Sequence, residues 1–147
     1  MSLQDWLNNK WLRPHKTSPD EIGNLMGIVD RDIQDANFRE VSADWRFGIA
    51  YNAALKLCTI LLYAKGFMPE RGLAHYRTIQ ALPLILGNER EEDKIYLDAC
   101  RIKRNKVEYD YSGGVTHAEA DELTQFVIEL KDDVKKWLKD NYPDLIQ

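Results

Sequence analysis

The residues best suited to chemistry lie in one short segment, Cys100–Tyr111. Four cations fall within six positions of it: Arg101, Lys103, Arg104 and Lys106. Four residues would share one helix face at i, i+3, i+4 and i+7: Arg101, Arg104, Asn105 and Glu108. The planar fork of an arginine binds phosphate oxygens in pairs, Asn105 can orient its neighbour, and the rings of Tyr109 and Tyr111 can stack on bases. The segment therefore predicts a site that recognises phosphate.

A plainer interpretation of this face is a solvated ion pair. Arg104 and Glu108 are four residues apart, and exposed helix pairs of this kind stabilise a protein by only about 0.3–0.5 kcal/mol. On either interpretation, we expect the opposite face, with Ile95, Ala99 and Ile102, to attach the helix to the core. Residue types and spacing leave both interpretations open.

The run Arg104–Tyr111 resembles the signature of the HEPN family (higher eukaryotes and prokaryotes nucleotide-binding domains). In that signature an arginine and a polar residue precede a histidine, and one toxin branch carries Arg-Asn-x-x-x-His-x-Tyr. Arg104 and Asn105 match this pattern, and Tyr111 matches the final tyrosine. Tyr109 stands in the position of the histidine.

Two further segments, Tyr51–Cys58 and His75–Gln80, also resemble small bacterial HEPN proteins, so the similarity covers about residues 18–140. The resemblance implies a homodimer whose motifs face each other across a basic cleft. Active relatives are metal-independent endoribonucleases: a ribose 2′-hydroxyl attacks the adjacent phosphate, arginine stabilises the developing charge, and histidine handles the proton. Many relatives belong to toxin–antitoxin or antiphage systems, often beside a nucleotidyltransferase, which implies an antitoxin partner of that kind. The resemblance implies a catalytic set of Arg104, Asn105 and Tyr109 and a binding set of Arg101, Tyr111, His75 and Arg77.

The tyrosine in the histidine position bears directly on catalysis. A free tyrosine has a pKa of about 10, so only about one in a thousand is ionised at pH 7. Neighbouring cations can lower that pKa, and His75 is an alternative source of an imidazole. We therefore expect a dimer that binds RNA or a nucleotide with weak or lost activity, as a toxin–antitoxin or defence component. The alternatives are an active metal-independent endoribonuclease and a non-catalytic helical scaffold that binds a partner protein.

The rest of the chain has no motif of a metal or nucleophile site. Cys58 and Cys100 are far apart in the sequence, which argues against a zinc ribbon or a disulfide scaffold and predicts buried core residues. HExxH, Walker, GxGxxG and GxSxG patterns are missing from the sequence. We therefore expect neither a metal nor a cofactor.

The helices that must position the segment are marked by their capping residues. Ser18, Ser42 and Thr116 each precede an apolar periodic stretch, and Asn88 begins a similar pattern. The predicted helices cover about 18–36, 42–65, 73–86, 88–109 and 116–141. These elements predict an all-α, five-helix bundle of HEPN-like, up-and-down type. Residues 1–16 form a short helical appendage, and residues 17–147 form a single bundle domain.

The second predicted helix is apolar on nearly every side, which is typical of the central helix of a bundle. Asn52, Lys56 and Thr59 form its one narrow polar stripe. Its longest apolar run, Leu55–Ala64, is interrupted by Lys56 and Thr59 and is too short to span a bilayer.

Composition sets the wider limits. With 147 residues, 44% of them hydrophobic and 30% charged, the chain is typical of one soluble globular domain. Its net charge of −4 argues against a nucleic-acid clamp that covers the whole surface, although it allows a local basic patch. No secretory signal is visible, so we expect a cytoplasmic protein with no membrane partner.

Overall fold

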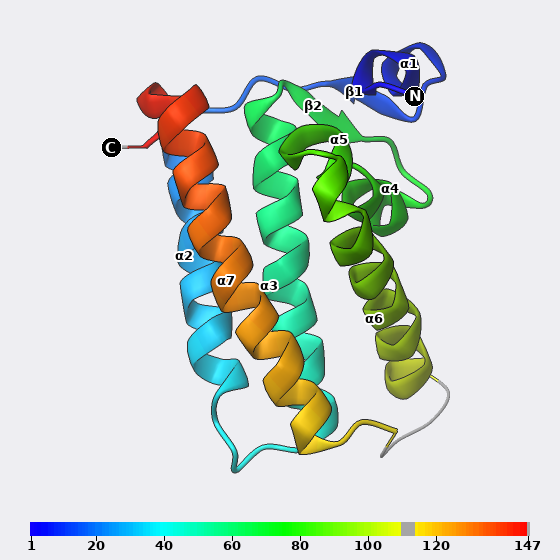
Figure 1. Ribbon diagram of the computed structural model, residues 1–147, viewed down its shortest axis with the longest axis vertical. Coiled ribbons are helices and arrows are strands. Elements are labelled where there is room, and N and C mark those ends of the chain that lie inside the picture. The colour runs from blue at the N-terminus through cyan, green and yellow to red at the C-terminus, as the bar shows by residue number, and fades with distance from the viewer. Residues whose placement is uncertain (110–113, 147) are drawn as a thin grey trace.

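The computed structural model describes residues 1–109 and 114–146, and for residues 107–109 it describes the backbone alone. Within this part, four long helices form an up-and-down bundle (Figure 1). They are α2 (Pro19–Ala36), α3 (Ala43–Ala64), α6 (Glu91–Tyr109) and α7 (His117–Asn141). The short helices are α1 (Leu3–Asn8), α4 (Ala74–Gln80) and α5 (Leu82–Leu86). The predicted all-α bundle is confirmed, with the third predicted helix divided into α4 and α5.

The capping residues begin three of the long helices as predicted. The hydroxyl groups of Ser18, Ser42 and Thr116 each accept a hydrogen bond from the backbone N–H three residues ahead, at 3.1, 3.2 and 3.1 Å. Gly66 follows α3 with φ of +92°, a conformation that glycine adopts without strain. The expected start of the fourth long helix is shifted, because Asn88–Arg90 forms a 3₁₀ turn and α6 begins after it.

Helix α3 is the central helix, as its apolar sequence predicts. It packs against α2, α7, α6 and α4, and its side chains are buried except along one narrow stripe. Asn52, Lys56 and Thr59 lie on that stripe and are partly exposed. By length and composition, the whole of α3 could also cross a membrane. The shorter run Leu55–Ala64 within it, taken alone, did not predict this. Since 67% of the relevant window is buried against other helices, packing inside the bundle accounts for its apolar character.

The N-terminal segment packs onto the bundle instead of standing apart. Leu12–Pro14 forms strand β1, which pairs antiparallel with strand β2, Phe67–Pro69, just after α3. This ribbon was not predicted, because its strands are three residues long and each contains a proline. A satellite cluster of buried side chains holds the segment in place: Leu3, Trp6, Leu12, Leu62 and Ala81.

The orientation of α6 corrects the sequence analysis. Ile95 and Ile102 are 60% and 45% exposed, and Ala99 is exposed too, so the face expected to meet the core faces outward. Arg101 and Arg104 lie on the inner side of the helix, beside aromatic rings of α4 and α3. The expectation was wrong because a long arginine stem can cover apolar surface while its charged end stays near water.

Candidate functional site: an arginine-lined groove along α3

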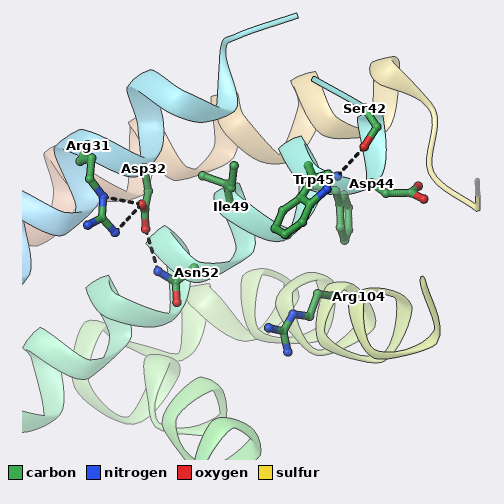
Figure 2. Close-up of a pocket in the computed structure, with 10 residues that line it drawn as sticks. Arg31, Asp32, Ser42, Asp44, Trp45, Ile49, Asn52 and Arg104 are labelled. Carbon is green, nitrogen blue, oxygen red and sulfur yellow. Dashed lines mark hydrogen bonds and ion pairs between the residues drawn. The ribbon is translucent and has the colours of Figure 1, made fainter. Parts of the chain in front are cut away.

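A cavity of about 490 Å³ opens between α2, α3 and α6 (Figure 2). Its floor is the N-terminal half of α3, where Gly48, Ile49 and Asn52 line it. Asp32 of α2 lines one side and Arg104 of α6 lines the other. The site therefore depends on the open side of α3, which α2 and α6 flank without covering.

Arg104 reaches this cavity from the last turns of α6. Its Nη1 donates a long hydrogen bond of 3.4 Å to Oδ1 of Asn105. Its Cζ lies 5.7 Å from the ring centroid of Tyr51, within the range of a cation–π contact. The amide of Asn105 and the ring of Tyr51 both contact the guanidinium from within the chain.

A buried carboxylate stands at the α2 side of the cavity. Asp32 is 4% exposed, and its Oδ2 accepts a hydrogen bond of 2.7 Å from Nδ2 of Asn52. Its Oδ1 accepts one of 3.0 Å from Nη2 of Arg31. Because Asn52 donates to Asp32, its carbonyl oxygen points away from that carboxylate (Figure 2). The cavity therefore offers an oriented amide as well as a cation.

The rim of the cavity is aromatic. Trp45, at the start of α3, is 70% exposed, which is unusual for so large an apolar side chain. A Cβ atom built on Gly48 would meet no atom within 4 Å, so the floor beside Trp45 is open. An exposed indole next to open space is a surface on which a planar ring can stack.

Positive charge continues along α3 beyond the cavity. Lys56 lies one turn after Asn52 on the polar stripe, and it makes no ion pair with any other described residue. Across from it, the ring centroid of His75 is 6.2 Å from that of Tyr51. Burial lowers the pKa of His75, and the charges of Arg104, Lys56 and Arg101 lower it further. His75 is therefore neutral at pH 7 and lies in a positive potential.

Tyr51 lies under this cluster of cations. It is 1% exposed, and its hydroxyl has no hydrogen-bond partner within the described part of the chain. Burial raises its pKa, and the nearby positive charges of Arg101 and Arg104 only partly offset that effect. The phenol is therefore neutral and is a hydrogen-bond donor rather than a base.

The other predicted site residues are divided between two places. Arg101 is bound to Asp98, with Nε 2.8 Å from Oδ1, and lies beside the ring of Tyr76 near the cation cluster. Arg77 stacks on Trp11 at 3.7 Å and lines a different cavity of about 300 Å³. The side chains of Tyr109 and Glu108, and the whole of Tyr111, lie outside the described residues.

Neither cysteine takes part in the site. Cys58 and Cys100 are buried, as predicted, and burial raises the pKa of each thiol to about 12, so both stay protonated. Among the residues that the structure describes, no three His, Cys, Asp or Glu side chains form a group that could hold a metal ion.

Sequence reasoning missed Asp32, Tyr51 and Trp45 as site residues. Asp32 and Trp45 come from separate helices and meet Arg104 only in the fold. The polar stripe on an otherwise apolar helix was the one available signal, because it marks the side of α3 that no other helix covers.

The chain was compared with family models, curated proteins and solved structures, and none of them matches it. The fold and the site therefore define its class by themselves. It is an all-α, up-and-down bundle with an arginine-lined groove along its central helix.

Proposed function

We propose that the groove binds RNA or a nucleotide, with Arg104 on a phosphate and Trp45 on a base. The observation that carries this proposal is that a guanidinium and a 70% exposed indole line one cavity. Arginine forks match phosphate oxygens, and stacking on an aromatic side chain contributes about 1–3 kcal/mol per base. The oriented amide of Asn52 supplies a further polar contact in the same cavity.

The cations beyond the cavity favour a ligand with more than one phosphate. Lys56 of α3 and Arg101 of α6 are near Arg104, since the charges of all three act on the same histidine, His75. A nucleotide chain that runs along this stripe would place successive phosphates beside successive cations, whereas a mononucleotide would use the cavity alone.

Binding with weak or lost catalysis is the function that we favour. The motif tyrosine is a poor proton acceptor at pH 7 unless its pKa is strongly lowered. One observation favours the alternative of a metal-independent endoribonuclease: the neutral imidazole of His75 can accept a proton beside Arg104. We further propose that the protein acts as a homodimer in the cytoplasm, as a toxin–antitoxin or defence component with an antitoxin partner, which follows from the HEPN resemblance.

The test compares wild type with Arg104→Gln by fluorescence anisotropy on a labelled single-stranded RNA and on a labelled mononucleotide. Arg71→Gln is the matched control, because Arg71 is an exposed arginine away from the groove. We expect Arg104→Gln to weaken binding at least about tenfold, the loss of one charge-assisted contact, and the control to leave it unchanged. No binding by the wild type, or equal binding by all three, would refute the proposal.

Product formation separates binding from catalysis. The wild type and the Tyr109→His variant are incubated with the same RNA in EDTA, and the products are separated on a denaturing gel. We expect no cleavage by the wild type. Cleavage by the wild type that disappears in His75→Gln would establish the nuclease alternative, and cleavage gained in Tyr109→His would identify a silenced nuclease.

A further inference from the structure

The outward face of α6 carries a regular seam of exposed side chains. Its members recur at intervals of three and four residues: Glu92, Ile95, Ala99, Ile102 and Lys106. Their isoleucines are 60% and 45% exposed. Its three apolar members, Ile95, Ala99 and Ile102, follow one another at steps of four and three residues, the spacing with which two helices pack side by side. We call these five residues the α6 seam.

The α6 seam is complementary to itself when one copy is reversed. Ala99 lies at its centre, Ile95 and Ile102 flank that centre, and the two ends are oppositely charged. Neither Glu92 nor Lys106 makes an ion pair with any other residue that the structure describes. In an antiparallel pair that crosses at Ala99, Ile95 of each copy packs against Ile102 of the second copy.

The same pairing brings opposite charges together at both ends. Glu92 of each copy meets the partner's Lys106, so a two-fold axis creates two attractive contacts. The small side chain of Ala99 lets the helices approach closely at their crossing point. Antiparallel helices also place opposite ends of their dipoles side by side.

We propose that the α6 seam is the contact surface for a second copy of this chain, packed antiparallel about Ala99. This goes beyond the binding function of the groove and does not depend on it. Arg104 lies on the opposite side of α6, so the pairing leaves each groove open and holds the two arginines back to back. The HEPN resemblance implies the other arrangement, in which the motifs face each other.

A charge exchange tests the register of the pairing. Sedimentation velocity without ligand compares wild type, Glu92→Lys, Lys106→Glu and the double variant. Each single change places like charges at both ends, and should raise the dimer dissociation constant at least about tenfold, because like-charge contacts at an interface are strongly unfavourable. The double variant should recover the dimer, because both pairs are restored with reversed sign.

Glu129→Lys is the matched control, since Glu129 is an exposed acid on α7. It should dimerise like the wild type, and circular dichroism should show the same helicity for every variant, because the changed side chains are all exposed. A wild type that stays monomeric at its highest soluble concentration would overturn the proposal. A dimer that tolerates both single exchanges, or that the double exchange fails to restore, would overturn it as well.

Discussion

The guanidinium of Arg104 lies beside the ring of Tyr51, with its Cζ 5.7 Å from the ring centroid. One residue comes from the last turns of α6 and the other from the middle of the buried central helix. A cation over an aromatic face is worth about 0.5–2 kcal/mol, depending on how far it is removed from water. The contact therefore couples the orientation of the arginine to the packing of the core.

Filling the floor of the groove should block the ligand without harming the fold. Gly48→Leu projects a side chain into open space, and leucine is about 0.5–1 kcal/mol more favourable than glycine within a helix. We expect a melting temperature equal to or above that of the wild type, and RNA affinity at least about tenfold lower, since the stacking contact is lost. Gly23→Leu is the matched control, because its Cβ also meets nothing within 4 Å. Undiminished binding in Gly48→Leu would place the ligand elsewhere.

The lysine on the polar stripe should contact a phosphate of an RNA chain. Lys56→Gln should reduce the slope of log affinity against log salt concentration by about 0.7, the value for one phosphate contact on a single strand. Its effect on mononucleotide binding should be small. Lys65→Gln, at the exposed end of α3, should leave the slope unchanged. Equal slopes for wild type and Lys56→Gln would confine the ligand to the cavity.

Acid should destabilise the fold partly through His75. Its pKa in the folded protein is lowered by burial and by the charges of Arg104, Lys56 and Arg101. The unfolded chain therefore binds a proton more readily, and the free energy of unfolding falls as the pH drops below about 6.5, the ordinary value for histidine. Urea unfolding across this pH range should show a smaller decline for His75→Gln than for wild type. Parallel curves would contradict the assigned environment of His75.

A buried arginine should hold the end of the bundle next to the groove. Arg46 is 1% exposed; its Nε donates to the backbone oxygen of Ala36, and its other nitrogens contact His117 and Asp121. Arg46→Met should lower the free energy of unfolding by about 1–3 kcal/mol, since it leaves a buried carbonyl without a partner. Arg39→Met removes an exposed arginine from the same aspartate, and should cost under about 1 kcal/mol. Chemical denaturation measures both, and equal losses would argue against this role for Arg46.

Local signals in the sequence predicted the bundle well, because helix caps and apolar periodicity act over a few residues. Ser42 and Thr116 begin helices for the same reason in any fold. The face of α6 was assigned wrongly, because hydropathy places Ile95 inside and Arg104 outside. Which face of a helix meets the core depends on the whole set of neighbours, and in α6 the arginine is accommodated by the ring of Tyr51.

The candidate site was only partly predictable for the same reason. Arg104 and Asn105 are adjacent in the sequence, so their association was visible there. Asp32 and Trp45 line one cavity with the arginine only when α2, α3 and α6 pack together, and the spacing of residues in the sequence does not show which helices will pack. The β1–β2 ribbon was missed because three-residue strands leave too few alternating positions to recognise.

The two ends of the described chain emerge at the same pole of the bundle, where α1 and the end of α7 lie (Figure 1). Arg104 is near the other pole, toward the last turn of α6. An affinity tag or a surface anchor attached at either terminus would therefore leave the groove facing solution. Ligand binding can therefore be measured on protein that is immobilised through a terminus. A domain fused to either terminus would lie far from the guanidinium of Arg104.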